Sequence, residues 1–276
     1  KGNGAANNMG IQKSKGSYIQ VLDADDLIGR NKIKSQIEQL TGENSDVISY
    51  GPWRLFSKQD GQYLLWEANR ENKENDKYLN WIRGWWVPLH SLLWTREAMM
   101  ANGPWDESLL NDIDGEFSMR YLRRGGHLKY CPKAWSYYRR ALKKRSVKNA
   151  SLLVTVAGLR SRIRVLRRQE KYLLKNGSMT EEYRDALAQR YFLIGAWAGD
   201  NFHIRELCYR NYKRYASTKN IPSHLSRAVR LLIRVFGYRR YYHIFKYLEP
   251  LLVGRRLSNA KRVNNIRNVF VFDETK

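Results

Sequence analysis

The sequence has few cysteines, few acidic residues compared with basic ones, and no long apolar run. Cys131 and Cys208 are too few and too far apart for a disulfide framework or a zinc site, which favours a reducing compartment. A membrane-spanning helix needs about 20 apolar residues. The most apolar segment, residues 151–159, runs directly into a cluster of arginines and is too short. The sequence therefore predicts neither a disulfide-stabilised fold nor a membrane span.

Acidic residues are scarce beside the 50 Lys and Arg: there are 26 Asp and Glu, and the net charge is +24. Residues 1–150 hold 24 basic and 17 acidic side chains, whereas residues 151–276 hold 26 and 9, so most of the excess lies in the second half. Such a balance is typical of a surface that meets phosphates of nucleic acid or of a membrane, or of a solvated basic face. Hydrophobic residues make up 43% of the chain, which indicates a folded globular protein.

The most informative segment, Ser17–Asp26, is an apolar run that ends in three carboxylates. Its β-branched and aromatic residues predict a buried strand, and ligands bind at the ends of such strands in open α/β sheets. Side chains two positions apart on an extended chain point the same way, so Asp23 and Asp25 could share a divalent cation or a sugar hydroxyl. The alternative is that Asp26 caps the following helix while Asp23 and Asp25 are solvated.

Residues 103–120, GPWDESLLNDIDGEFSMR, resemble the acceptor-side motif of family 2 glycosyltransferases, enzymes of the GT-A fold. In that family an Asp-x-Asp motif, here Asp23 and Asp25, follows a strand, and the later motif supplies the catalytic base. The segments 4–10 and 15–19 also resemble the family's approach to that strand, although Asn7 and Ser14 depart from its commonest pattern. The three motifs occur in the family's order, and the resemblance covers roughly residues 2–140.

The resemblance implies an α/β, GT-A-like mixed sheet that lacks its first βα units. Only 22 residues precede Asp23, fewer than the roughly 30 of one βαβ unit, so we expect the C-terminal part of a longer protein, without the nucleotide-base pocket. Residues 1–148 would form this partial domain, and residues 149–276 a basic helical accessory region.

The resemblance further implies transfer of a sugar from a nucleotide-diphosphate donor to a hydroxyl of a glycan or lipid-linked acceptor, with inversion, in the synthesis of cell-surface polysaccharide or glycoconjugate. Asp114 would be the catalytic base, with Asp112 as the alternative. Asp25 and Asp23 would hold Mg²⁺ or Mn²⁺. The remaining candidates are Asn8 and Arg139 on the donor side, and Trp105, Asp106, Glu107, Glu116, Arg120 and His90 on the acceptor side.

Each assignment has a structural alternative. Asp112 and Asp114 could only cap a helix, and Glu116 and Arg120 could form an ordinary surface ion pair at i,i+4. At the level of the whole chain, the rivals are a basic nucleic-acid-binding protein, for which no recognition signature is present, and an inactive interaction fragment.

The remaining pattern predicts local structure. We expect a helix at 31–40, strands at 46–51 and 91–94, a hairpin of 53–56 with 62–66, a polar loop at 67–76, and a helix from the base motif to Gly125. Ser178 and Glu181 have the spacing of a capping box before a helix that runs to Trp197. The basic amphipathic segment 225–236 would either pack internally or lie on an anionic membrane. We expect a cytoplasmic protein, peripheral on the inner face of the cell membrane.

Overall fold

Helices and strands alternate in the first half of the chain, and the second half is helical. The computed structural model describes residues 2–59, 62–140, 155–216 and 261–263. The predicted boundary at residue 148 and the predicted basic helix at 225–236 lie outside these residues.

The described strands form two mixed sheets. The first has the order β1 (Tyr18–Ile19), β6 (Leu92–Thr95), β3 (Val47–Tyr50) and β7 (His127–Tyr130), with β3 and β7 parallel and the other pairs antiparallel. The second has the order β2 (Leu27–Ile28), β8 (Ser136–Arg139), β4 (Trp53–Gln59), β5 (Gln62–Asn69) and β9 (Lys261–Val263), with β4 and β8 parallel. This mixed α/β architecture confirms the expected fold class.

The two sheets are joined where the chain passes from β3 to β4 and from β7 to β8. Gly51 lies in the first of these passages, and a Cβ atom there would lie 1.8 Å from the carbonyl oxygen of Ala134 in the second. A residue with a side chain would therefore force the two passages apart. This close approach holds β8 beside β4, and thereby fixes the position of Tyr138 and Arg139.

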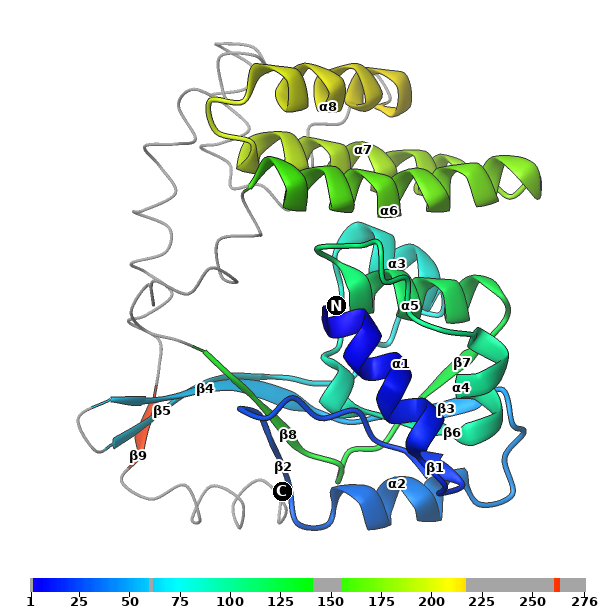
Figure 1. Cartoon of the computed structure of the whole chain (residues 1–276), viewed down its shortest axis with the longest axis vertical. Helices are drawn as coiled ribbons and strands as arrows, with labels where there is room; N and C mark the ends of the chain where they lie inside the picture. Colours follow the sequence, from blue (N-terminus) through cyan, green and yellow to red (C-terminus); the bar gives the residue numbers. More distant parts are fainter. Residues whose placement is uncertain (1, 60–61, 141–154, 217–260, 264–276) are drawn as a thin grey trace.

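Helices cover both faces of the first sheet. One face carries α2 (Lys32–Leu40), and α3 (Lys77–Arg83) and α5 (Ile113–Arg123) lie on the opposite side (Figure 1). The other short helices of this half are α1 (Asn3–Lys13), η1 (Leu89–Ser91) and α4 (Arg96–Asn102). Polar caps fix two of the starts: Asp76 accepts a hydrogen bond from the Leu79 amide of α3, and Thr95 accepts one from the Ala98 amide of α4.

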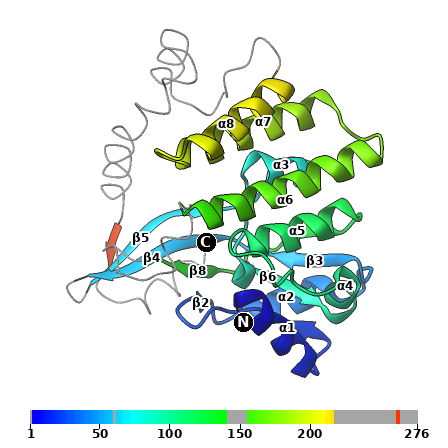
Figure 2. The same cartoon turned by 45° about the horizontal axis from the view of Figure 1, so that its top comes forward.

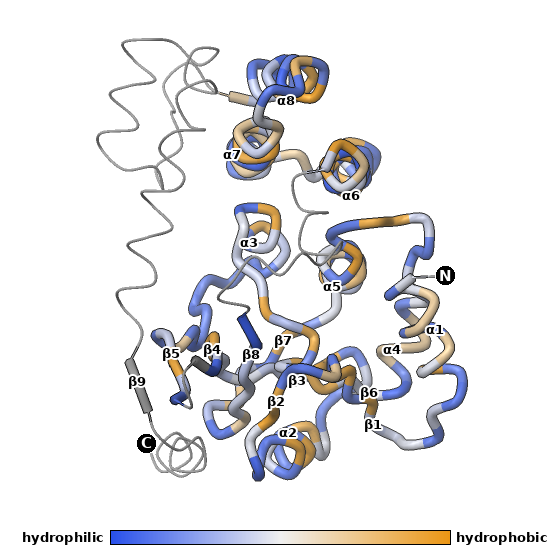
Figure 3. The backbone as a smooth tube through the Cα atoms, turned by 60° about the vertical axis from the view of Figure 1, so that its left-hand side comes forward, coloured by the Kyte–Doolittle hydropathy of each residue, from blue (hydrophilic) through white to orange (hydrophobic). Residues whose placement is uncertain are grey.

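Three longer helices, α6 (Val156–Lys175), α7 (Glu181–Trp197) and α8 (Phe202–Tyr215), stack beyond α3 and α5 (Figures 1 and 2). Figure 3 views them nearly end on. Their buried side chains, among them Leu159 and Tyr191, belong to the same hydrophobic cluster as Trp94 and Phe117. The helical region therefore shares one core with the sheet region, and α6 is held against the loop before α5.

Most of the predicted elements are confirmed, with shifts of a few residues. The strand before the acidic residues is shorter than expected, since β1 ends at Ile19, and the polar loop starts later because β5 extends to Asn69. The predicted capping box is wrong: Thr180, not Ser178, precedes α7 and accepts a hydrogen bond from the Tyr183 amide. Among the described residues, no helix combines the length and apolar character of a membrane span.

Candidate active site

The acidic residues Asp23–Asp26 form a turn between β1 and β2. The Asp26 amide donates a hydrogen bond to the Asp23 carbonyl oxygen at 3.1 Å, which closes the turn. Asp23 and Asp25 are exposed, whereas Asp26 is buried. The turn thus presents two carboxylates to solvent and directs the third into the protein.

Asp26 anchors the turn to two other parts of the chain. Its carboxylate lies 2.8 Å from Nδ1 of the buried His90 and accepts a hydrogen bond of 2.7 Å from the Arg139 amide. The alternative that Asp26 caps the following helix is wrong, because Asn31 occupies that position. A buried carboxylate needs such partners, since an unpaired charge away from water is costly.

His90 and Tyr138 pack against each other beside the turn. Their rings stack with centroids 5.8 Å apart. Burial raises the pKa of Tyr138, and so do the negative charges of four carboxylates, Asp26, Asp23, Asp114 and Asp25. Three of these belong to the acidic turn and one to α5, so Tyr138 marks the place where the two acidic segments meet.

Asp114 lies in the first turn of α5 and faces the acidic turn. Its side chain is accessible to solvent, yet crowded by protein atoms, and this loss of hydration together with the nearby charges of Asp23 and then Asp112 raises its pKa to about 6. The indole of Trp105 opposes the rise, although its N–H has no hydrogen bond of normal geometry. The structure therefore brings together Asp23 and Asp114, which the sequence placed in separate motifs.

Asp112 immediately precedes α5 and has an unusual backbone. Its φ of 59° lies in the left-handed region, and among the described non-glycine residues it alone has a positive φ. The side chain makes no capping hydrogen bond; a Cβ atom on Gly115 would lie 2.2 Å from its Oδ1. The positive charge of Arg190, from α7, acts on this carboxylate. Asp112 thus occupies the N-cap position of α5, but its side chain does not cap the helix.

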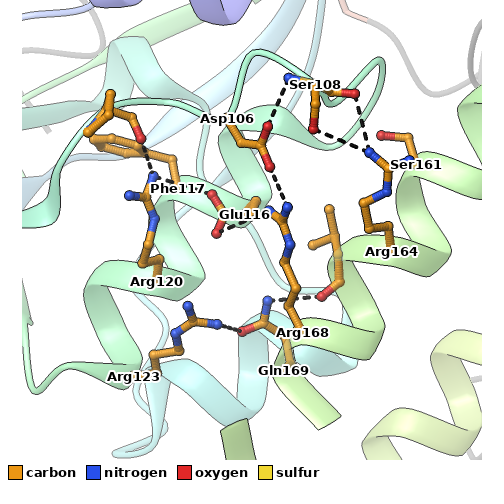
Figure 4. Close-up of polar contacts among 12 residues, drawn as sticks. Asp106, Ser108, Glu116, Phe117, Arg120, Arg123, Ser161, Arg164, Arg168 and Gln169 are labelled. Carbon is orange, nitrogen blue, oxygen red and sulfur yellow. Dashed lines mark hydrogen bonds and ion pairs between the residues drawn. The ribbon is translucent and has the colours of Figure 1, made fainter. Parts of the chain in front are cut away.

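Asp106, Glu116 and Arg120 belong to a network that joins the loop before α5, and α5 itself, to α6 (Figure 4). Arg168 of α6 donates a hydrogen bond to the Asp106 carboxylate and lies 3.8 Å from that of Glu116. Burial raises the pKa of Asp106, but hydrogen bonds from Ser108 and Arg168 outweigh it and lower the pKa to about 2. Asp106 is therefore held as a charged partner of α6.

Glu116 and Arg120 form the predicted i,i+4 ion pair at 3.3 Å, but it is mostly buried and does not lie on an open helix surface. Arg120 also donates hydrogen bonds of 2.7 Å to the carbonyl oxygens of Asn102 and Pro104. Trp105 is 2% exposed and stacks on Phe117, with ring centroids 3.5 Å apart. These residues shape the loop that leads to Asp112 and to α5, whose first turn contains Asp114.

Asn8, expected on the donor side, lies instead against the acceptor motif. Its side-chain amide donates hydrogen bonds to the carbonyl oxygen of Trp105 at 3.0 Å and to the carboxylate of Glu107 at 2.8 Å, and it accepts one from the Trp105 amide. These three contacts use both ends of the amide group. Asn8 thus ties α1 to the loop before α5, the helix that contains the candidate base.

Arg139, which the resemblance assigned to the donor side, lies beside the acidic turn. Its Nε donates a hydrogen bond of 2.6 Å to the carbonyl oxygen of Asp25, and its guanidinium lies 4.6 Å from the ring centre of Phe56. The residue is nevertheless exposed. Within the described residues, no group of three His, Cys, Asp or Glu side chains is placed to hold a metal ion. The two residues expected to hold a metal, Asp23 and Asp25, are exposed carboxylates of the acidic turn.

Four residues of this region were not among the sequence candidates: Asp26, Tyr138, Lys32 and Arg190. Asp26 and Tyr138 each adjoin a candidate, so the motifs already pointed to their neighbourhood. Nothing in the local sequence marks Lys32 or Arg190, because their importance depends on contacts with distant segments. Lys32 is completely buried and donates hydrogen bonds to Gln20 and Gln36, and burial lowers its pKa to about 7.

Comparison with known proteins concerns the first part of the chain. Residues 1–90 match the model of glycosyl transferase family 2. The similarity to this family model therefore covers the N-terminal third of the chain. Glycosyltransferase GlyG of Streptococcus pneumoniae is 32% identical over 66 residues, which cover 24% of this chain and 22% of that protein.

Two uncharacterized glycosyltransferases align over longer segments. The one from Methanocaldococcus jannaschii is 24% identical over 121 residues, 44% of this chain and 41% of that protein. The one from Haemophilus influenzae is 27% identical over 99 residues, 36% of this chain and 38% of that protein. The chain thus spans less than half the length of each of these relatives.

Proposed function

We propose that this chain forms the metal-binding and acceptor-binding part of a glycosyltransferase that moves a sugar from a nucleotide-diphosphate donor to an acceptor hydroxyl, in the synthesis of a surface polysaccharide or glycoconjugate. The observation that carries the proposal is the approach of Asp23, in the acidic turn, to Asp114, at the start of α5. Donor phosphates and the attacking hydroxyl must meet at one anomeric carbon, so their binding groups must converge.

Asp23 and Asp25 are the residues that fit a hard divalent cation. Mg²⁺ is commonly bound by one or two carboxylates together with substrate phosphates and water, so two exposed carboxylates suffice on the protein side. When bound, Mg²⁺ or Mn²⁺ would neutralise the charge that develops on the departing diphosphate. Arg139 is positioned beside Asp25 and could contact the same phosphate groups.

Asp114 is suited to remove the proton from the acceptor hydroxyl. A pKa of about 6 leaves the carboxylate mostly ionised at neutral pH, and makes it a stronger base than an ordinary aspartate. A hydroxyl activated there would attack the sugar from the side opposite the diphosphate, so the configuration at the anomeric carbon would invert. Asp112 would assist by its charge, and Arg190 would hold it in place.

The test measures sugar transfer by the full-length protein with a panel of nucleotide sugars. Asp114→Asn should cut kcat by two orders of magnitude or more, as loss of a general base does, while donor binding stays nearly unchanged. Asp25→Asn should abolish metal-dependent turnover, because an amide is a poorer ligand for a hard cation. Asp46→Asn, which changes an exposed aspartate near β3, is the matched control and should retain activity.

Unchanged turnover in both Asp114→Asn and Asp25→Asn would refute the proposed site. If Asp112→Asn alone shows the loss of kcat, then the base is Asp112 and the remainder of the mechanism stands.

A further inference from the structure

A recess of about 490 Å³ lies between α6 and α8, on the part of the chain that the family resemblance does not cover. Five basic residues of α6 line it: Arg160, Arg164, Arg167, Arg168 and Lys171. No carboxylate is among the lining residues. We refer to this recess and its rim as the α6–α8 face.

Among the described residues, most of the basic side chains of the α6–α8 face have no acidic partner. Arg168 is paired with Asp106 and Glu116, and Arg164 contacts the neutral Ser108. Within the part of the chain that the structure describes, Arg160, Arg167 and Lys171 have no acidic partner. They and their neighbours recur at spacings of three and four along α6, where like charges repel one another. An external anion would relieve this repulsion.

Apolar side chains accompany these charges. Ile163, Ile204 and Leu207 also line the recess. Neighbouring recesses at the same helix pair include Leu174 of α6 and Phe202 of α8, which are 47% and 63% exposed. These recesses also contain Glu170 and Glu206, which pair with Arg214 and Arg210. Exposed apolar residues beside a basic rim are typical of surfaces that enter the interface of an anionic membrane.

We infer that the α6–α8 face docks on a membrane surface that contains anionic phospholipid. The headgroup phosphates would contact Arg160, Arg167 and Lys171, and Phe202 and Leu174 would enter the boundary between headgroups and acyl chains. A nucleic acid would satisfy the charges, but it would leave these two apolar side chains in water, so the membrane fits the whole face better. This inference does not depend on the proposed catalytic site.

The docking would also place the acceptor loop near the membrane. Arg164 and Arg168 line the recess and at the same time contact Ser108 and Asp106 of that loop (Figure 4). Both residues are therefore poor choices for a test, because their replacement would disturb the loop.

The experiment is flotation of the full-length protein with phosphatidylcholine vesicles that contain or lack phosphatidylglycerol. The variant Arg160→Gln, Arg167→Gln, Lys171→Gln should bind the anionic vesicles at least roughly tenfold more weakly than the wild type, since basic residues near an anionic surface each contribute measurably to binding. All three side chains are exposed, so the fold should be retained. The matched control, Lys13→Gln, Lys15→Gln, Lys133→Gln, loses the same charge from exposed positions elsewhere and should bind nearly as well as the wild type.

A second variant, Phe202→Ser with Leu174→Ser, should weaken binding to the same vesicles without any change of net charge. Equal binding by the wild type and the α6 variant, or equal weakening of the α6 variant and its charge-matched control, would overturn the inference. So would an α6 variant that loses binding to a single-stranded oligonucleotide but not to vesicles. Because these readouts are independent of turnover, their failure would leave the proposed glycosyl transfer untouched.

Discussion

Burial and then the charge of Asp23 raise the pKa of Asp114, although the two residues belong to motifs far apart in the sequence. The two residues come near each other because the acidic turn is anchored by Asp26 to His90 and to β8, while the loop before α5 is held by α1 and α6. A carboxylate that is partly desolvated and faces a second carboxylate is a common arrangement at sites of acid-base chemistry. The effect of the Asp23 charge on the pKa of Asp114 can therefore be measured by titration.

Asp23→Asn should lower the pKa of Asp114 from about 6 toward the usual range of aspartate. Removal of a neighbouring negative charge favours the ionised form of Asp114, so it titrates at lower pH. Carboxyl ¹³C NMR titration of the metal-free protein checks this directly. Asp25→Asn is the matched control, because Asp25 is not among the charges that raise this pKa. An equal shift in both variants would contradict the assignment of Asp23 as the responsible neighbour.

The sequence could predict the acidic turn and the acceptor motif because each is a local pattern. Three acids after an apolar run, and a Trp-Asp-Glu segment before a helix, are visible without knowledge of any contact. The sequence could not decide whether Asp26 caps a helix or pairs with a distant residue. That choice depends on where His90 and β8 lie, and so on how the chain pairs its strands.

The sequence also could not show which distant residues the side chain of Asn8 contacts. The resemblance placed it with the donor-side residues, but α1 turns its amide toward Trp105 and Glu107. Likewise, the sequence predicted one basic helical region for residues 149–276, without separating the roles of its arginines. Only the packing separates Arg168, which binds the acceptor loop, from Arg160 and Arg167, which face outward.

Lys32 should give the protein a stability that rises with pH. Its pKa is about 7 in the folded state and 10.5 ordinarily, so between these values the unfolded chain binds more protons than the folded one. The free energy of unfolding then increases with pH across this window, by at most about 1.4 kcal/mol per pH unit. Urea unfolding at several pH values should show that Lys32→Met removes this slope. Lys34→Met, at an exposed position of the same helix, should keep the slope.

Arg168 should connect the helical region to the acceptor loop energetically. Arg168→Met removes the hydrogen bond to Asp106 and one neighbour of the buried Glu116. The free energy of unfolding should fall by about 1–2 kcal/mol, the usual range for loss of a partly buried charged hydrogen bond. Arg167→Met, at the adjacent exposed position, should change it little. A loss of equal size in both variants, measured by urea unfolding, would mean that the Asp106 contact contributes nothing of its own.

Gly115 offers a way to move the Asp112 carboxylate while Asp112 itself is kept. A methyl group at this position would lie 2.2 Å from Oδ1 and 3.0 Å from Cγ of Asp112, so the Asp112 side chain must rotate away. Rotation of a side-chain end costs little, and alanine is favoured over glycine in a helix by roughly 1 kcal/mol, so Gly115→Ala should raise the free energy of unfolding by no more than roughly 1 kcal/mol and should not destabilise the fold.

The kinetic outcome of Gly115→Ala then separates the two candidate bases. If Asp114 is the base and Asp112 only adds negative charge, displacement of the Asp112 carboxylate should lower the Asp114 pKa slightly and reduce kcat by no more than roughly tenfold. If Asp112 is the base, the same change should reduce kcat as severely as Asp112→Asn does. Combination of Gly115→Ala with Asp112→Asn completes the cycle: the two effects should be non-additive, since both act through one carboxylate. Strict additivity would show that Gly115 acts on the reaction by a route that does not involve Asp112.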